Sequence, residues 1–447
     1  MTLRQTLETY LDKRIFWVFL MGCASGFPWV LIGSAMSGWL KDSGLTRTAI
    51  GLFGSIFAVY AINFLWAPLL DRVRLPILHR LGQRRSWIFL MQGLMLALTA
   101  SIALVDPSVS LMLTSFIAFG IASASATQDI AIDAFRIDHF ANSPEHQIPA
   151  ASAMAVIGWW TGYSLPGYIA FRYADILGWS GVYWILASFV IVLMFFTLIT
   201  KEPWSDRDRM QAELQSHYTR FGQSRFAKAA QWLAVTVWEP LADFMRRNGV
   251  RTALAILLFV FLFKIGEAFL GRMSIVFYKE IGFSNEQIAD YTKMLGWFAT
   301  VAFTLLGSII NVRLGVVKGL LIGGSAMALS NLMFAWIALA GPKEWLFAMT
   351  IVVDNFTTAF SSVAFVSFLT ALTGKAFSAT QYALLASIGN LGRTTIASGS
   401  GWFVDVTGSW VLFFVLTAVL VIPGLVLLMM IKHRVTALNP TALKSGE

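Results

Sequence analysis

The chain has 447 residues, of which 57% are hydrophobic and 13% are charged. Soluble domains carry roughly 25% charged residues, so this composition excludes a water-soluble protein and indicates lipid as the solvent. The net charge is +9, but the basic residues gather in loops on one side of the predicted membrane, which argues against nucleic acid as a partner. Cys23 is the only cysteine and the five histidines are scattered, so we expect no intrachain disulfide, no metal and no cofactor.

Twelve apolar stretches, each long enough to cross a bilayer, follow one another along the chain. The first has basic residues before it but is too long for a signal peptide, so we interpret it as a retained helix. The predicted fold is an all-α integral membrane protein, with twelve transmembrane helices in two six-helix, pseudo-symmetric bundles at residues 1–200 and 250–447. The predicted spans are 15–38, 47–70, 87–105, 109–137, 149–171, 179–200, 251–278, 286–310, 317–340, 345–372, 377–400 and 409–431.

The distribution of Lys and Arg predicts the orientation of the spans. If both termini are cytoplasmic, the inner segments hold most of the 33 basic residues, as the positive-inside rule requires. The predicted outer loops hold only Lys41, Arg47, Arg172, Lys279 and Lys343. We therefore predict a multi-pass membrane protein with both termini in the cytoplasm.

Residues 201–249 form a predicted cytoplasmic linker between the two bundles. Its apolar run at 231–238 is too short to span a bilayer. Two interpretations remain open: a helix that lies on the inner membrane surface, anchored by Trp232 and Trp238, or a soluble linker helix.

The fourth span carries Asp129, Asp133 and Arg136. Spacings of four and three place them on one helical face, near the cytoplasmic end of the span. Charged groups at bilayer depth are costly and seldom face lipid. The two carboxylates are proton-coupling candidates that could share one proton, and Arg136 is a substrate-binding candidate. The alternative is a structural ion-pair cluster at a helix end.

The second half also carries charges near the middle of the membrane. Lys264 and Glu267 are three residues apart in the seventh span and can pair, while Asp354 has no basic neighbour in its own helix. Glu267 and Asp354 are therefore proton-coupling candidates, and Lys264 and Arg393 are candidates for binding an anionic ligand. The alternatives are a structural Lys264–Glu267 pair, and an Arg393 that pairs with Asp354 or Glu267. Arg272 and Lys293 are expected nearer the outer face, where snorkelling explains them.

Two spans contain helix-bending or close-packing sequences. Span 1 has the run Ser25-Gly26-Phe27-Pro28, which can bend a helix. Span 5 has small residues at 158, 162 and 167, which allow close packing, and between them Trp159, Trp160 and Tyr163. These aromatic rings are candidates for stacking on a sugar ring; the alternative is a role in packing or as interface anchors.

Tight basic turns follow the second and the eighth spans. The first of them contains Asp71, Arg72, Arg84 and Arg85, and we interpret it as a gating loop. The turn resembles the loop signature of the major facilitator superfamily, in which Asp-Arg and later Arg pairs follow a Gly; Ala67 stands here where that Gly is expected.

Several segments resemble the AmpG-type muropeptide permeases, a branch of that superfamily. They are 377–385 (FSATQYALL) with Arg393 further on, 128–136 (QDIAIDAFR), 240–249 (PLADFMRRNG) leading into 263–269 (FKIGEAF), and Pro423-Gly424-Leu425. The resemblance implies uptake of anhydromuropeptides from the periplasm, driven by protons, across the bacterial inner membrane. Gln128, Asn355 and Gln381 join the substrate-binding candidates. Unlike the family, the chain has no Arg in span 5, and Glu267 replaces the usual Asp.

We therefore predict a secondary transporter, not an enzyme, that imports anhydromuropeptides or a related anionic solute with a proton. Its partners would be an anionic sugar-peptide and the bilayer, and it would act as a monomer. One alternative is a transporter of another substrate, such as a siderophore or an acyl-coenzyme A. An alternative of another class is a membrane-embedded transferase, for which the chain shows no His or Cys cluster.

Overall fold

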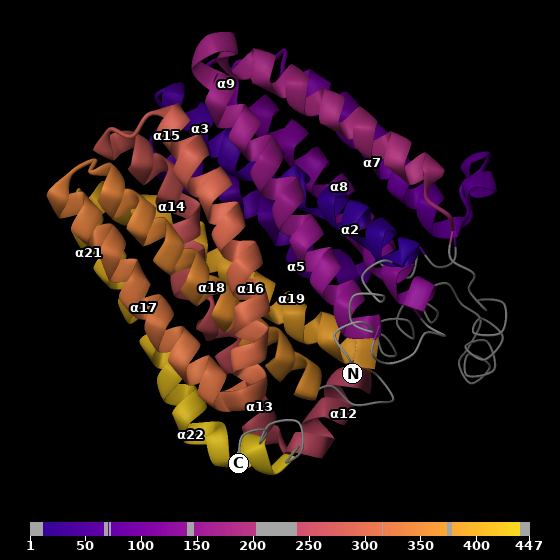
Figure 1. The fold of residues 1–447 in the computed structure, drawn as a ribbon, viewed down its shortest axis with the longest axis vertical. Coiled ribbons are helices and arrows are strands. Elements are labelled where there is room, and N and C mark those ends of the chain that lie inside the picture. Colours follow the sequence, from indigo (N-terminus) through magenta and orange to yellow (C-terminus); the bar gives the residue numbers. More distant parts are fainter. Residues whose placement is uncertain are drawn as a thin grey trace.

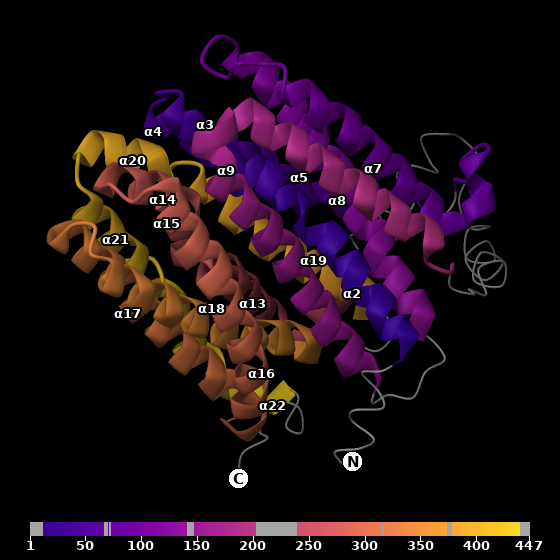
Figure 2. The ribbon, with the colours of Figure 1, turned by 45° about the horizontal axis from the view of Figure 1, so that its top comes forward.

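The computed structural model describes residues 12–66, 70, 73–140, 147–202, 239–314, 316–372 and 378–438. Every regular element in these ranges is a helix. The helices form two bundles, one from the first half of the chain and one from the second, which lie side by side (Figure 1). Turning the molecule keeps the two sets apart, with α9 and α19 near the boundary between them (Figure 2).

Each predicted span coincides with helical segments. The first half contains α2 (Lys13–Gly26), the π-helical η1 (Val30–Ser34), α3 (Ala35–Asp42), α4 (Arg47–Phe53), the 3-10 helical η2 (Gly54–Ala58), α5 (Val59–Ile62), η3 (Asn63–Leu65), η4 (Leu78–Leu81), α7 (Gln83–Ile102), α8 (Leu111–Phe140) and α9 (Gln147–Ile199). The long α9 holds the fifth and sixth spans, joined at Gly178, where a φ of 67° breaks the helix.

The second half begins with α12 (Glu239–Asn248), which lies in the predicted linker. The other elements are α13 (Val250–Phe263), α14 (Ile265–Ile281), α15 (Asn285–Ile288), the π-helical η6 (Ala289–Leu295), α16 (Gly296–Leu314), α17 (Val316–Ala340), α18 (Glu344–Leu372), α19 (Ser378–Ala397), α20 (Ser400–Thr407), α21 (Trp410–Val419) and α22 (Ile422–Leu438). Trp232 and Trp238 lie outside the described residues, so the surface helix of the linker stays a prediction.

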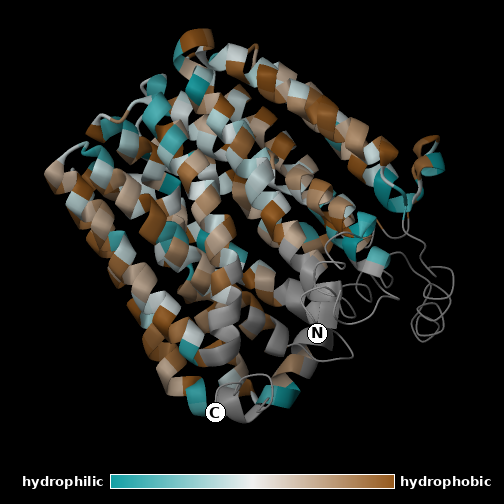
Figure 3. Cartoon of the chain, in the orientation of Figure 1, coloured by the Kyte–Doolittle hydropathy of each residue, from teal (hydrophilic) through white to brown (hydrophobic). Residues whose placement is uncertain are grey.

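The lengths and surfaces of the helices suit a bilayer. Nine helices among the described residues are long and apolar enough to cross a membrane, and one of them, Met154–Ile199, contains both legs of α9. The second leg of α9, after Gly178, is hydrophobic along most of its length (Figure 3). The prediction of an all-α membrane protein is confirmed.

Helix interruptions gather at the middle of the molecule. In the first span, α2 ends at Gly26 and the π-helical η1 follows Pro28, as the proline predicts. In the seventh span, Lys264 has φ −101° and ψ 7° and separates α13 from α14. The π-helical η6 interrupts the eighth span. π-Helical turns are rare and frequently lie at functional sites. These interruptions therefore indicate that a functional site lies near the middle of the molecule.

Glycines bring α2 and α9 into direct backbone contact. A Cβ atom on Gly26 would lie 1.9 Å from the carbonyl oxygen of Trp159, and one on Gly162 would lie 2.1 Å from that of Cys23. Both distances are far below van der Waals contact, so only glycine fits. The close packing expected of span 5 is confirmed, and it holds Trp159 and its aromatic neighbours against the first span.

Ion pairs join the two halves at one end of the molecule. We call this the closed end; it is where α3 and α14 end, opposite the end where α2 begins and α22 ends. Five ion pairs between described residues cross from one half to the other, and all five lie at the closed end: Lys41–Glu280, Arg47–Glu280, Arg47–Asp405, Arg172–Glu286 and Lys279–Asp42. Beside them, α4 packs tightly on α20, because a Cβ on Gly401 would meet the Arg47 carbonyl at 1.9 Å.

Candidate functional site: a cavity between the two halves

A cavity of ≈ 300 Å³ lies between the halves. Both halves line it, and the interrupted elements η1 and η6 each contribute to its wall. The lining residues are Trp29, Gly33, Ser34, Ser37, Phe57, Tyr60, Trp159, Trp160 and Tyr163 from the first half, and Glu267, Ala268, Leu270, Gly271, Arg272, Ser274, Ile275, Tyr278, Thr292, Lys293, Ile351, Asp354, Asn355, Thr358, Asn390, Arg393 and Thr394 from the second.

The wall from the first half is aromatic and, among the described lining residues, carries no charge. The ring of Trp29 lies 4.5 Å from that of Phe57 and 5.7 Å from that of Trp159. Trp159 stacks on Tyr163 at 5.6 Å. The structure thus brings the predicted Trp159, Trp160 and Tyr163 together at the cavity, and adds Trp29, Phe57 and Tyr60, which the sequence interpretation had not singled out.

The wall from the second half holds all the charged lining residues: Glu267, Arg272, Lys293, Asp354 and Arg393. Three are cations and two are carboxyl groups, so the wall carries a net positive charge even when both carboxyls are ionised. A ligand in this cavity meets flat rings on one side and an excess of positive charge on the other.

Lys264 lies behind this wall rather than in it. Its side chain is 3% exposed. The ammonium forms an ion pair with Glu267 and donates to the hydroxyls of Ser361 and Ser362 at 3.0 and 2.9 Å. Buried charges need such partners, so the structure supports the alternative of a structural Lys264–Glu267 pair.

Glu267 has a second cation beside it. Arg393 Nη2 lies 3.6 Å from Glu267 Oε1, and the Arg393 side chain is 41% exposed. The arginine reaches the cavity with donors to spare, because its guanidinium carries five N–H groups. Glu267 therefore neutralises one cation behind the wall and partly neutralises another in it.

Asp354 lies in a different environment. The hydroxyl of Ser330 donates to its carboxyl at 3.3 Å, and among the described residues no cation lies within ion-pair distance of it. Its neighbour Asn355 lines the cavity but is tied to its surroundings, since it accepts from Thr300 at 2.6 Å and donates to the Ile351 carbonyl at 2.7 Å.

The structure corrects the expected position of Arg272 and Lys293. They do not snorkel toward an outer face but line the central cavity, and Lys293 is only 2% exposed. The π-helical turn around Lys293 shifts its direction in a way that a regular 3.6-residue period does not predict. Arg272 lies four residues after Ala268, which also lines the cavity, so the two share one face of α14.

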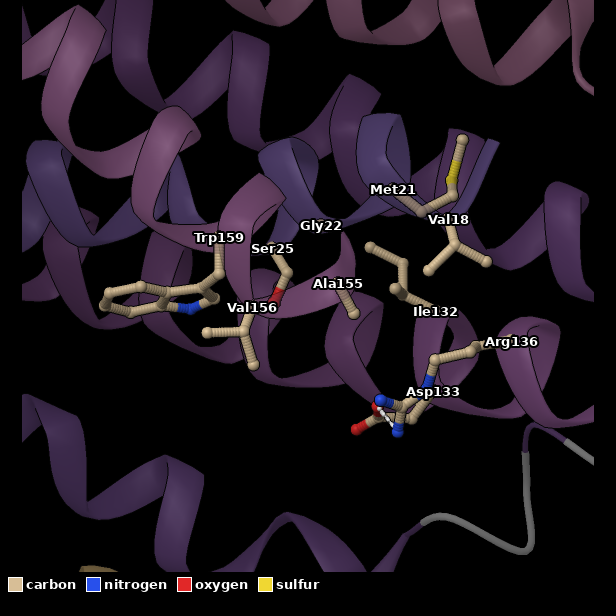
Figure 4. Close-up of a pocket in the computed structure, with 10 residues that line it drawn as sticks. All are labelled: Val18, Met21, Gly22, Ser25, Ile132, Asp133, Arg136, Ala155, Val156 and Trp159. Carbon is tan, nitrogen blue, oxygen red and sulfur yellow. Dashed lines mark hydrogen bonds and ion pairs between the residues drawn. The ribbon is translucent and has the colours of Figure 1, made fainter. Parts of the chain in front are cut away.

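A second, smaller pocket holds the charges of the fourth span. Arg136 Nη2 lies 2.9 Å from Asp133 Oδ1, and both line the pocket together with Ser25 and Trp159 (Figure 4). Asp129 does not join this ion pair; it accepts a hydrogen bond from Ser25 at 2.7 Å. Trp159 lines both this pocket and the central cavity.

Of the remaining predicted residues, those whose side chains the structure describes line neither cavity. Gln128 is fully buried and donates to the Ala24 carbonyl at 2.8 Å, which ties α8 to α2. In the predicted gating loop, Arg84 pairs with Asp138 at 3.2 Å and Arg85 donates to the Thr197 carbonyl at 2.9 Å, both within the first half. Asp71 and Arg72 lie outside the described residues, as does the side chain of Gln381.

Comparison with known proteins places the chain among transporters. A family model described as the Major Facilitator Superfamily matches residues 18–397. The chain is 33% identical to the putative transporter AmpG 4 of Rickettsia conorii, over 96% of this chain and 99% of the relative. It is 30% identical to the anhydromuropeptide permease of Escherichia coli strain K12, over 96% of this chain and 82% of that protein.

Solved structures share the fold at low sequence identity. A POT family transporter crystallised with a thioalcohol-conjugated peptide superposes with a TM-score of 0.68 at 14% identity, covering 94% of this chain and 96% of that one. A D-xylose–proton symporter superposes with a TM-score of 0.63 at 14% identity, covering 92% and 96%. The predicted all-α fold of the major facilitator superfamily is confirmed.

Proposed function

The chain belongs to the AmpG-type muropeptide permease family of the major facilitator superfamily, and on this premise we propose that it imports anhydromuropeptides, or a closely related anionic sugar-peptide, together with protons. It is a multi-pass membrane transporter of a small molecule and not an enzyme, which excludes the transferase alternative.

The observation that carries the proposal is the division of the central cavity into an aromatic wall and a cationic wall. Sugar rings stack on aromatic side chains through their apolar faces, whereas peptide carboxylates bind Arg and Lys through charge-assisted hydrogen bonds. Trp29, Trp159 and Tyr163 supply the first surface, and Arg272, Lys293 and Arg393 supply the second. A solute that is part sugar and part anionic peptide matches both.

Protons supply enough free energy for this uptake. A proton that moves down about 100 mV yields about 2.3 kcal/mol, which corresponds to roughly fiftyfold accumulation of solute. Asp354 and Asp129 are the proposed proton carriers, because each is hydrogen-bonded by a serine and neither has a described cation at ion-pair distance. Glu267 is assigned instead as the counter-ion of Lys264 and Arg393.

We further propose that the closed end faces the periplasm of a bacterial inner membrane and that both termini are cytoplasmic. The cross-half ion pairs at that end would then block entry from outside, so the described conformation would load or release solute on the cytoplasmic side. The halves would be residues 1–200 and 250–447, joined by a cytoplasmic linker at 201–249, and one chain would suffice for transport.

Uptake into proteoliposomes tests the proposal. The purified full chain would be reconstituted, and entry of radiolabelled N-acetylglucosaminyl-anhydromuramyl tripeptide would be measured with and without an imposed inward proton gradient. We expect accumulation only with the gradient, and competition by unlabelled muropeptide but not by a siderophore or coenzyme A. Uptake at the same rate without the gradient would contradict the proposed proton coupling. Competition by a siderophore or coenzyme A would contradict the proposed substrate class.

A further inference from the structure

Arg272 and Lys293 come from different helices of the second half, yet both reach across to the first half in the same way. The guanidinium of Arg272 lies 4.8 Å from the centre of the Phe57 ring, and the ammonium of Lys293 lies 3.9 Å from the centre of the Tyr163 ring. These distances are within cation–π range. Each cation therefore contacts an aromatic face of the opposite half at the wall of the cavity.

A glycine lies beside each ring and makes room for the cation. A Cβ atom on Gly54 would lie 2.3 Å from Arg272 Cζ, and one on Gly167 would lie 3.1 Å from Lys293 Cε. Gly54 is three residues before Phe57 and Gly167 is four residues after Tyr163, so in each case the glycine and the ring share a helical face. We call these two glycine–aromatic pairs the seats of the cations.

Neither cation has an anionic partner among the described residues. Among the described residues, no carboxylate forms an ion pair with Arg272 or Lys293. The Nε atom of Arg272 is buried and has no hydrogen-bond partner among them. Lys293 is 2% exposed. A buried cation without a counter-ion is costly, and a cation–π contact is weaker than a charge-assisted hydrogen bond to a carboxylate. Both groups are thus suited to exchange a ring for an anion.

We propose that Arg272 and Lys293, beside Arg393, each take one of two carboxylates of one solute, and that the glycine–aromatic seats hold these two cations while the cavity is empty. The inference rests on the proposed transport of an anionic sugar-peptide and names the groups that recognise it. Because each seat belongs to the opposite half, a carboxylate that draws a cation away also removes a contact between the halves, which couples binding to their separation.

A binding cycle with two ligands tests the assignment. The affinity of the purified full chain for N-acetylglucosaminyl-anhydromuramyl tripeptide, and for the same compound with its carboxylates converted to amides, would be measured by calorimetry. We expect Arg272→Gln and Lys293→Gln each to weaken binding of the carboxylate form roughly tenfold to a hundredfold and to leave binding of the amide form nearly unchanged. Equal losses for both ligands, or no loss, overturn the proposal.

Matched controls come from exposed cations outside the cavity. Lys343 lies in an exposed loop and Arg251 is exposed at the start of α13. We expect Lys343→Gln and Arg251→Gln to bind both ligands as the unaltered chain does. The charge-preserving variants Lys293→Arg and Arg272→Lys should retain most of the carboxylate affinity. A loss as large as that of the glutamine variants would overturn the role of charge.

A ligand-free measurement separates failure of this inference from failure of the proposed substrate. Asn390→Cys, in a Cys23→Ser background, places a thiol at the cavity wall, and its reaction rates with anionic and cationic methanethiosulfonates report the local potential. We expect the anionic-to-cationic rate ratio to fall roughly threefold or more in Arg272→Gln and Lys293→Gln, and not in the controls. An unchanged ratio overturns the anion site, whereas a fall in the ratio without muropeptide binding overturns only the proposed substrate.

Discussion

Arg47 Nη2 in the first half lies 2.7 Å from Glu280 Oε2 in the second. The same carboxylate accepts from Lys41 at 2.5 Å and from the indole of Trp410 at 2.9 Å, and its side chain is only 14% exposed. Three donors on one half-buried carboxylate form a network rather than an isolated surface pair, and networks are the ion pairs that stabilise. Glu280 is therefore the central anion of the closed end.

Removing the charge of Glu280 should open the closed end more often. Charge-assisted hydrogen bonds contribute about 1.5–3 kcal/mol each, so Glu280→Gln should raise the population of the opened state roughly tenfold or more. The check is the rate at which Ser37→Cys, in a Cys23→Ser background, reacts with an impermeant thiol reagent added outside right-side-out vesicles. Glu344→Gln is the matched control, because Glu344 accepts from Gln287 and Tyr291 of its own half. Equal labelling rates in the Glu280→Gln and Glu344→Gln variants would contradict the role of Glu280 in keeping the closed end shut.

Neutralising Glu267 alone should destabilise the protein. Glu267→Gln leaves Lys264 buried without its counter-ion, and breaking a buried ion pair from one side costs about 3–5 kcal/mol. We expect a clear fall in the Tm of the detergent-purified chain. The double variant Glu267→Gln with Lys264→Met removes both charges and should recover most of the loss. If the double variant is no more stable than Glu267→Gln, the loss of stability does not come from the unpaired charge of Lys264.

Asp354→Asn should separate transport from its driving force. The asparagine preserves the shape and a hydrogen bond to Ser330, but it cannot take up a proton. We expect exchange of labelled for unlabelled muropeptide across the vesicle membrane to continue, while accumulation under an imposed proton gradient is lost. The same two measurements on Asp129→Asn show which of the two carboxyls carries the proton, because only the variant of the carrier should lose gradient-driven accumulation. Full gradient-driven accumulation in both variants would exclude both residues.

A side chain at Gly26 should separate α2 from α9. Because a Cβ there would lie 1.9 Å from the carbonyl oxygen of Trp159, Gly26→Ala forces a backbone shift, and overpacking of this kind costs roughly 1–3 kcal/mol. The measurement is the Tm, compared with that of Gly93→Ala. The nearest atom to a Cβ on Gly93 is the Met194 Cε at 3.9 Å, so this control should be almost neutral. Similar Tm values would contradict the packing argument.

The sequence predicted the helices better than it predicted the cavity. Long apolar runs and the Lys and Arg distribution are one-dimensional signals, and each of the twelve spans coincides with helical segments. The break after Pro28 is also a local property that sequence reveals, and the small residues around Gly162 indicate a helix that can pack closely, although not which helix it packs against. The apolar runs and the proline break can be read from the residues of one segment, without knowing what the segment packs against.

The directions in which the charged side chains point depend on local helix geometry that the sequence does not show. Lys264 was expected to bind ligand, but the non-helical turn at that residue directs it to Ser361 and Ser362 of another helix. Lys293 was expected near an outer face, but its π-helical turn brings it to Tyr163. A shift of one residue in helical phase rotates a side chain by about 100°, so such turns decide which cations meet the ligand.

Trp159 borders both the central cavity and the pocket of Asp133 and Arg136, and the tight contact of its carbonyl with Gly26 leaves its backbone little freedom. The indole of Trp159 is thus a wall that the two pockets share. A smaller residue at this position would therefore enlarge both pockets at once, and its effect would reach the charges of the fourth span as well as those of the central cavity.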